Sequence, residues 1–134
     1  MIQGAKDKLA KISNGQIVGY RPLRGKKHLQ HVGELPAVVT SKNTASTNKA
    51  ILSRDSNDVI TCDCMLVNVT GAKRVSIGTV SEIAWAWLLH KPIVLVIEET
   101  GNLHEHGFIL EMCQHRTTDL DEGIALVKNI LMDS

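Results

Sequence analysis

The sequence predicts a single α/β domain in which helices cover both faces of a parallel sheet. Two unbroken apolar runs of strand length, 64–69 and 93–97, flank an almost wholly apolar helix predicted over 79–90. Continuous apolar strands are typical of sheets buried on both faces, and a helical crossover is the connection that parallel strands need. With 134 residues, of which 43% are hydrophobic, the chain can form one core without disulfides.

The amino-terminal segment differs in composition from the rest of the chain. Residues 1–16 are polar and end close to the turn signal Asn14-Gly15. We therefore expect an N-terminal extension over 1–16 and the domain itself over 17–134.

The elements of this domain follow from hydrophobic periodicity and from turn residues. In chain order we expect strands at 17–20 and 36–40, a helix at 49–62, the strand at 64–69, the helix at 79–90, the strand at 93–97, and helices at 104–114 and 119–132. The last helix begins at Asp119 or Asp121, which are good capping residues. Ligands bind beyond the carboxyl ends of strands in such sheets, so we expect the site in the loops after Val18, Val69 and Ile97.

The composition argues against several kinds of partner. Fifteen basic and fourteen acidic residues give a net charge of +1, which lacks the positive excess of a nucleic-acid binder. The aromatic residues (two Trp, one Tyr and one Phe) are too few for a base-stacking platform. No apolar run has the length of a membrane span. Three cysteines without a secretory signal favour a reduced, cytoplasmic protein.

The cysteines also raise the question of a metal site. Cys62 and Cys64 could supply two ligands, with His104, His106 or His115 as further ones. The usual zinc spacings are absent, so buried thiols are the better interpretation, and we expect neither metal nor cofactor.

Glu82 is the most informative residue, because it is the only charged side chain between Ser76 and Leu89. A carboxylate near the start of so apolar a helix is either satisfied locally or functional. Thr79-x-x-Glu82 matches a capping box, in which Thr79 caps the helix and Glu82 reaches back to the Thr79 amide. Alternatively, an ionised Glu82 faces an electron-poor sugar carbon, as nucleophile or as stabiliser of an oxocarbenium-like transition state. The spacing leaves both interpretations open.

Two further features would complete such a site. Ser76, Gly78 and Thr79 offer hydroxyls and amides at a helix start, where an anion binds, although an ordinary capped turn uses the same residues. A second acid is needed to protonate a leaving base, and Asp55 and Asp63 are the candidates. For Asp63, an ordinary turn acid is the more favoured interpretation.

Several segments of the chain follow one family pattern in order. They are Arg54-Asp55, Cys62-Asp63, Leu66-Val67-Asn68, Gly71 to Thr79, Glu82 to Ala86, and Lys91 to Val94. These segments resemble the nucleoside 2-deoxyribosyltransferase superfamily, especially its small phage and bacterial members, which include the 2′-deoxynucleoside 5′-monophosphate N-hydrolases. The resemblance covers 49–114, is weak over 17–48 and is absent over 1–16. It implies a Rossmann-like (flavodoxin-like) parallel sheet.

The resemblance also implies roles for individual residues. Glu82 falls on the catalytic glutamate, which attacks or stabilises the anomeric carbon, and Asp55 falls on the aspartate that serves proton transfer to the base. Ser76 falls on a serine that contacts the 5′-phosphate. The remaining candidates for substrate binding are Gly78, Thr79, Asp63 and Asn68.

The loop over 22–27 resembles the Arg-Gly phosphate loop of the hydrolase branch. Arg24, Lys26 and Lys27 would supply charge-assisted hydrogen bonds to a phosphate, and Gly25 of the same loop is a further candidate for substrate binding. Without the resemblance, these cations would be an ordinary solvated loop.

The sequence departs from the family pattern early in the first strand. Val18 stands where the family has a tyrosine near the sugar, and Tyr20 follows two positions later on the same face of the strand. Tyr20 either substitutes as a catalytic residue or the activity is lost. The motif Gly101 to His106 recurs in phage-type members, and we expect His104 and His106 to be satisfied structural or surface histidines.

Together these observations predict cleavage of the N-glycosidic bond of a 2′-deoxynucleoside or its 5′-monophosphate, with deoxyribose transferred to water or another base. The expected partners are a small nucleoside or nucleotide and further copies of the chain in a homodimer or higher homo-oligomer, with no nucleic-acid polymer and no membrane. The alternative is a non-catalytic module that senses or sequesters a nucleotide. A further alternative is an interaction protein whose helix at 79–90 forms a dimer face, which is compatible with either activity.

Overall fold

The computed structural model describes residues 47–132. The strands expected at 17–20 and 36–40 lie outside the described residues, as do the N-terminal extension and the site candidates Tyr20, Arg24, Gly25 and Lys26.

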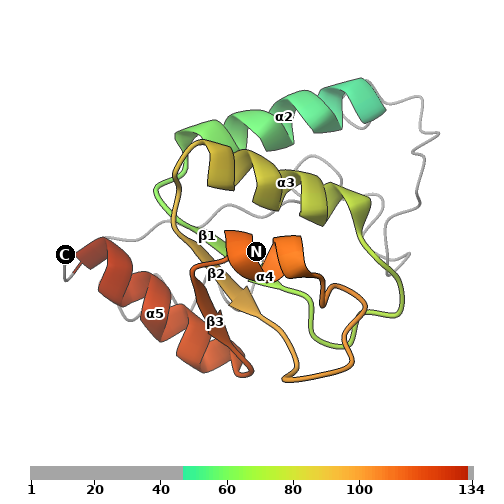
Figure 1. The fold of residues 1–134 in the computed structure, drawn as a ribbon. Helices are drawn as coiled ribbons and strands as arrows, with labels where there is room; N and C mark the ends of the chain where they lie inside the picture. Colours follow the sequence, from blue (N-terminus) through green and yellow to red (C-terminus); the bar gives the residue numbers. More distant parts are fainter. Residues whose placement is uncertain (1–46, 133–134) are drawn as a thin grey trace.

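Strands and helices alternate along this part of the chain (Figure 1). Their order is α2 (Asn48–Thr61), β1 (Met65–Asn68), α3 (Ile77–Leu88), β2 (Ile93–Val96), α4 (Gly107–Met112), β3 (His115–Thr117) and α5 (Leu120–Met132). The strands form a parallel sheet in the order β1-β2-β3, with Val67 opposite Leu95 in the first pair and Leu95 opposite Arg116 in the second. This is a Rossmann-like α/β unit, which confirms the predicted fold class.

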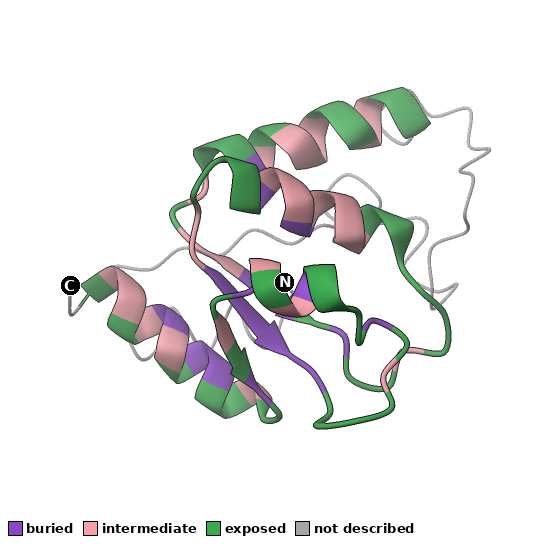
Figure 2. Cartoon of the chain, viewed as in Figure 1, coloured by how far each residue is buried: buried purple, intermediate pink, exposed green. Residues whose placement is uncertain are grey.

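Helices cover both faces of the sheet, and β2 is the buried centre of the fold (Figure 2). Side chains of β2 alternate between the two faces, as in any strand. Ile93 and Leu95 belong to one core cluster, with buried residues of α2, α3 and α4. Val94 and Val96 belong to the other, with Ile124 and Val127 of α5. The continuous apolar run is therefore explained by burial on both sides.

The structure corrects the bounds of two predicted helices and adds one strand. Helix α3 begins at Ile77 rather than at residue 79, because Ser76 provides the cap. The helix expected at 104–114 is confined to Gly107–Met112. The strand β3 was not predicted, because His115-Arg116-Thr117 is too short and too polar to give a hydrophobic pattern; its pairing with β2 makes it a strand.

The start of α5 agrees with the prediction of an aspartate cap. The amide of Glu122 donates to Oδ2 of Asp119 at 3.3 Å, and the amide of Gly123 donates to the Asp119 carbonyl at 3.0 Å. Among the helices of residues 47–132, none has the length and apolar character that crossing a membrane requires.

Candidate functional site

Two loops meet at the carboxyl edge of the sheet, where the sequence predicted the site. The first follows β1 and leads into α3, and the second, 97–106, leads from β2 into α4. The amide of Gly71 in the first loop donates to the Glu98 carboxylate in the second at 2.9 Å. The site candidates on α3 start directly at this junction.

Ser76 caps α3 and sets the geometry of its first turn. Its Oγ accepts a hydrogen bond from the Thr79 amide at 3.2 Å and lies 2.9 Å from Thr79 Oγ1. The cap is therefore at Ser76, and the interpretation of Thr79-x-x-Glu82 as a capping box is wrong. Glu82 belongs to the second turn of the helix, too far along it to bond the cap amide.

Glu82 is half-buried on the side of α3 that continues from Thr79. Residues three and four positions apart share a helix face, so Glu82 lies between Thr79 and the buried Ala86. The cap hydroxyl, Thr79 and the carboxylate thus follow one another along one side of the helix.

Asp55 lies on α2, which packs directly against α3 (Figure 1). The two helices run in the same direction and both begin on the side of the molecule where the carboxyl ends of the strands lie. Asp55 is half-buried, one turn before the buried Val59, and its Oδ1 is shielded from solvent. The two predicted catalytic carboxylates therefore come from neighbouring helices, each about halfway along its helix.

The first turn of α3 is open to solvent. The first amides of a helix have no intrahelical acceptor, and in α3 they belong to Ile77 and Gly78, both exposed. A Cβ at Gly78 would meet no described atom within 4 Å beyond its two chain neighbours and the backbone of its own helix. A ligand group can therefore approach these amides closely.

Asn68 and Asp63 lie at opposite ends of β1. Asn68 ends the strand at the site edge, where its Oδ1 accepts from the Thr70 amide at 3.0 Å and from Thr70 Oγ1 at 2.7 Å. Its carboxamide oxygen thus shapes the loop, and its NH₂ group remains as the donor that could face a ligand. Asp63 is exposed before the amino end of β1, so the strand separates it from Ser76 and the first turn of α3.

The loop after β2 supplies polar residues to which the sequence assigned no role. The carboxamide of Asn102 donates to the Val69 carbonyl and to Glu98 Oε1, both at 2.8 Å. Its Oδ1 accepts from the His104 amide at 2.8 Å and lies 3.1 Å from His104 Nδ1. The one sequence feature that indicates a role for these loop residues is that their loop directly follows a buried strand.

His104 contacts the start of α3 itself. The ring is 2% exposed, and its Nε2 accepts the hydrogen of the Ser76 amide at 2.9 Å. Nε2 must therefore be unprotonated, and Nδ1 carries the hydrogen that faces Asn102 Oδ1. Burial lowers the pKa of His104, which agrees with a neutral ring. The expectation of a satisfied structural histidine is confirmed for this residue.

The second loop also fixes an anionic group. The Gly71 amide and the Asn102 carboxamide both donate to Glu98, and these bonds lower the pKa of that carboxyl. Glu98 is exposed and stays ionised as the anchor of the junction between the two loops.

The cysteines are poor ligands and poor nucleophiles in their protonated form. Burial raises the pKa of the Cys64 thiol to about 12 and that of Cys113 to about 11, and it also raises the pKa of Cys62. The thiolate, which binds metals and attacks electrophiles, is therefore disfavoured. Within residues 47–132, no three His, Cys, Asp or Glu side chains come together as a group that could hold a metal ion.

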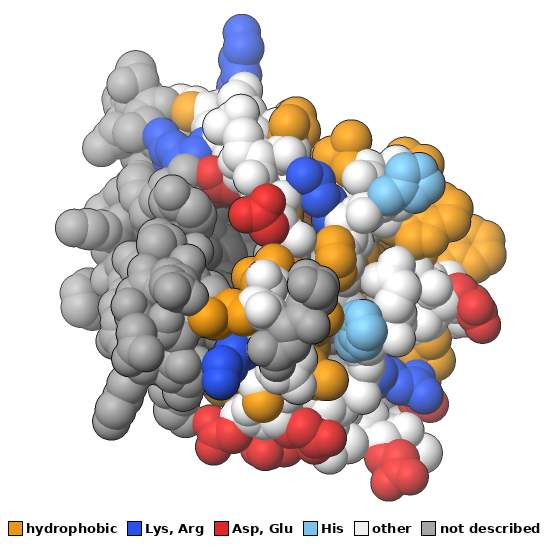
Figure 3. Space-filling view, turned by 90° about the vertical axis from the view of Figure 1, so that its left-hand side faces the viewer, with side chains coloured by type: hydrophobic (Ala, Val, Ile, Leu, Met, Phe, Trp, Pro, Cys, Tyr) orange, Lys and Arg blue, Asp and Glu red, His pale blue; other side chains and the backbone are white. Residues whose placement is uncertain are grey.

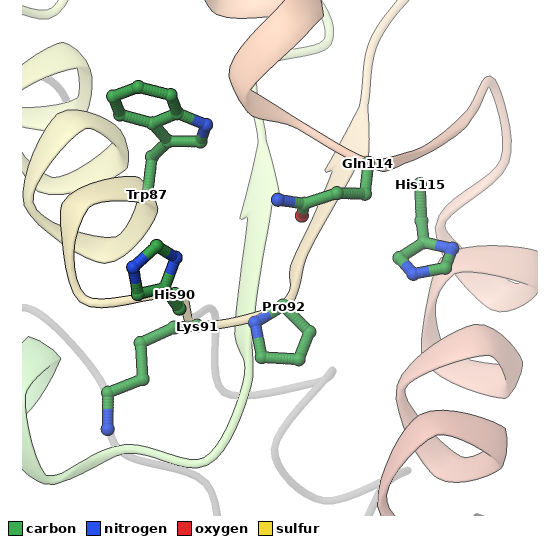
Figure 4. A pocket seen from close by; sticks show the side chains of 6 residues that line it. All are labelled: Trp87, His90, Lys91, Pro92, Gln114 and His115. Atoms are coloured by element: carbon green, nitrogen blue, oxygen red, sulfur yellow. The ribbon is translucent and has the colours of Figure 1, made fainter.

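A shallow hollow of about 280 Å³ lies at the opposite edge of the sheet (Figure 4). Its lining comes from the end of α3 and from the segments before β2 and β3: Trp87, His90, Lys91, Pro92, Gln114 and His115. Gln114 holds the Ile93 amide at 3.1 Å, and the Lys91 side chain points away from Gln114 and His115 (Figure 4). Of the site candidates that lie within residues 47–132, none lines this hollow.

Comparison with known proteins gives one match. The model of a family described as nucleoside 2-deoxyribosyltransferase matches residues 4–126, which is most of the chain and begins within the predicted extension. Neither a curated protein nor a solved structure matches the chain.

Proposed function

The chain belongs to the nucleoside 2-deoxyribosyltransferase family, and from this premise we propose that it cleaves the N-glycosidic bond of a 2′-deoxynucleoside or its 5′-monophosphate. Membership supports an enzyme of this kind with a nucleoside as its small-molecule substrate. The finer proposal concerns the acceptor of the deoxyribosyl group, which is water in a hydrolase or a second base in a transferase.

In the proposed reaction, the Glu82 carboxylate acts at C1′ of the sugar. Its oxygen forms a bond to C1′ while the bond from C1′ to the base nitrogen breaks, through an oxocarbenium-like transition state. Asp55 gives its proton to the departing base. Water or a second base then attacks C1′, the ester to Glu82 breaks, and the proton of the attacking group passes to Asp55.

The first turn of α3 is the proposed place for a phosphate group. Ser76 offers a hydroxyl, and the exposed amides of Ile77 and Gly78 point out of the helix start, where the helix dipole favours an anion. Arg24, Gly25 and Lys26 of the predicted phosphate loop are proposed to complete the contacts. Tyr20 is proposed to stand in for the tyrosine of the family.

The observation that carries this proposal is the match over residues 4–126, which includes both proposed carboxylates. The geometry adds two supports. Glu82 is half-buried in the second turn of α3, and the cap is Ser76, so a capping box does not explain its position. Asp55 is half-buried on the adjacent helix, with one oxygen shielded from solvent.

The test is a panel of the deoxynucleosides and their 5′-monophosphates, with ribonucleosides as the control, incubated with the protein and separated by chromatography. We expect free base from at least one deoxy substrate. Adding a second base distinguishes the two acceptors: a new nucleoside means transfer, and free deoxyribose or its phosphate means hydrolysis.

Tight binding of a nucleotide that is returned unchanged would contradict the proposal and would indicate the non-catalytic module. Absence of both binding and cleavage across the whole panel would contradict both functions.

We also propose a homodimer. Helices α3 and α4 carry large exposed apolar side chains, among them Ile77 (77% exposed), Trp87 (47%) and Phe108 (76%). Figure 3 shows hydrophobic side chains gathered beside a histidine on one side of the molecule. Large apolar patches on a soluble protein mark interfaces, so a second copy is the proposed cover.

A further inference from the structure

The motif Gly101 to His106 has no place in the proposed reaction, yet its side chains make several polar contacts. Asn102 uses both ends of its carboxamide, and His104 uses both ring nitrogens. The bond to Glu98 and those between Asn102 and His104 stay within the loop 97–106. The other two leave that loop and reach two points on the chain, the Val69 carbonyl and the Ser76 amide.

These two points are the ends of the loop between β1 and α3. Val69 follows directly after β1, where its amide bonds to the Val96 carbonyl at 3.0 Å and so belongs to the rigid sheet. Ser76 is the cap of α3. Between them, residues 73–75 are exposed. Asn102 and His104 therefore bridge the loop at its base.

Each ring nitrogen of His104 has a fixed role, one as donor and the other as acceptor. Asn102 Oδ1 keeps the hydrogen on Nδ1, which leaves the lone pair of Nε2 to accept from Ser76. With its amide held, Ser76 keeps the extended backbone in which its Oγ reaches the Thr79 amide. Ile77 and Gly78 follow Ser76 directly, so their amides begin the helix next to a residue whose own amide is held.

We propose that Asn102 and His104 form a brace, and that His104 is a positioning residue that holds Ser76 and the first turn of α3 in the orientation that binds substrate. The proposal rests on the proposed function, because Ser76 acts on the substrate and His104 acts through Ser76. The ring touches no substrate, and its contribution is to fix the atom that does.

A matched pair of substitutions separates the acceptor at Nε2 from the size of the side chain. In His104→Gln, the carboxamide oxygen reaches about the position of Nε2 and can accept from Ser76. In His104→Asn, the carboxamide is one carbon shorter and reaches only the position of Nδ1. His106→Asn is the control, because His106 is exposed and its Nδ1 accepts from Phe108 instead, at 3.0 Å.

The first readout is hydrogen exchange of the Ser76 amide followed by NMR, which needs no activity. We expect exchange roughly tenfold faster in His104→Asn than in the wild type, and close to the wild-type rate in His104→Gln and His106→Asn. Equal protection of this amide in all four proteins would overturn the brace.

The second readout is the split between KM and kcat. We expect KM for the 5′-monophosphate to rise roughly tenfold in His104→Asn, to recover in His104→Gln, and kcat to change by less. If Ser76 loses protection and KM nevertheless stays at the wild-type value, His104 is structural and not a positioning residue.

The two proposals fail separately. If the wild type releases no base from any substrate, the proposed function fails, while the exchange rates still decide whether the brace exists. In that case, the dissociation constant of a nucleoside monophosphate is measured in place of KM. An equal dissociation constant for His104→Asn and His104→Gln would overturn the positioning role.

Discussion

His104 is a titratable residue whose protonation state the fold fixes by geometry. Its sequence context, between Leu103 and Glu105 in a polar loop, does not reveal that the ring is buried. Its hydrogen-bond partners are Asn102 and Ser76, the second of which is 28 residues away in the chain. A contact of this range leaves no periodicity, so the sequence predicted a satisfied histidine but could not name its partners.

The neutral ring makes stability depend on pH. The pKa of His104 lies below its ordinary value of 6.5 in the folded protein because burial disfavours the charged form. Between the two values the unfolded chain binds more protons, so the free energy of unfolding falls as the pH drops from about 6.5 toward the folded pKa, and levels off below it. Urea unfolding at several pH values measures this loss.

His104→Gln removes the titrating group and is the control. Its unfolding free energy should vary less over the same pH range than that of the wild type. Equal pH dependence in the two proteins would mean that another group causes it.

At the scale of elements, the capping of α3 shows both the reach and the limit of sequence patterns. Two cap signals overlap, because Ser76-x-x-Thr79 precedes Thr79-x-x-Glu82 at the same spacing. The capping-box pattern Thr79-x-x-Glu82 favoured a start at residue 79. In the structure Ser76 is the cap and its amide donates to His104, a contact that is invisible in the sequence.

The two caps predict different stability effects. Ser76→Ala removes the oxygen that accepts the Thr79 amide and should lower the free energy of unfolding by about 1 kcal/mol. Thr79→Ala keeps that bond and should cost less than half as much. Denaturant melts of both variants measure this, and a larger loss from Thr79→Ala would restore the capping box.

Helix α5 lies close to the sheet at Gly123. A Cβ at this position would lie 2.8 Å from Cγ2 of Val96, which is itself in the centre of the core. In Gly123→Ala, the higher helix propensity of alanine stabilises the fold by up to about 1 kcal/mol. The clash of the new methyl group with the rigid, β-branched Val96 destabilises it by roughly 1–3 kcal/mol. We therefore expect a net loss of about 1 kcal/mol.

Thermal or urea unfolding of Gly123→Ala measures this balance. Ala125→Gly is the control on the same helix, at an exposed position where only propensity acts. A Gly123→Ala protein more stable than the wild type would show that α5 can move away from β2.

At the scale of the whole molecule, the sequence predicted the parallel sheet and its two helical layers correctly. Both features follow from local patterns: the continuous apolar strands indicate a sheet buried on both faces, and the apolar side of α5 indicates a helix that packs on it. The pairing of β3 and the joining of the two loops at Glu98 depend on contacts between distant segments. The fold class was therefore predictable, and the supporting contacts of the site were not.

The exposed apolar side chains of α3 and α4 predict self-association. Sedimentation equilibrium of the wild type should give a dimer, and Phe108→Asp should shift the distribution toward the monomer by placing a charge on the apolar surface. Glu111→Gln, on the same short helix, is the control and should leave the mass unchanged. A wild type that is monomeric at all concentrations would contradict the homodimer.

The central claim is that the Glu82 carboxylate carries out the chemistry at the sugar. Its most direct test is the rate of base release by Glu82→Gln, which keeps the size of the side chain and removes its charge, beside Glu111→Gln, which makes the same change at an exposed position of α4. We predict that Glu82→Gln loses at least roughly a thousandfold in kcat, while its melting curve and the activity of Glu111→Gln stay close to those of the wild type. A Glu82→Gln protein that releases base at the wild-type rate would contradict the account.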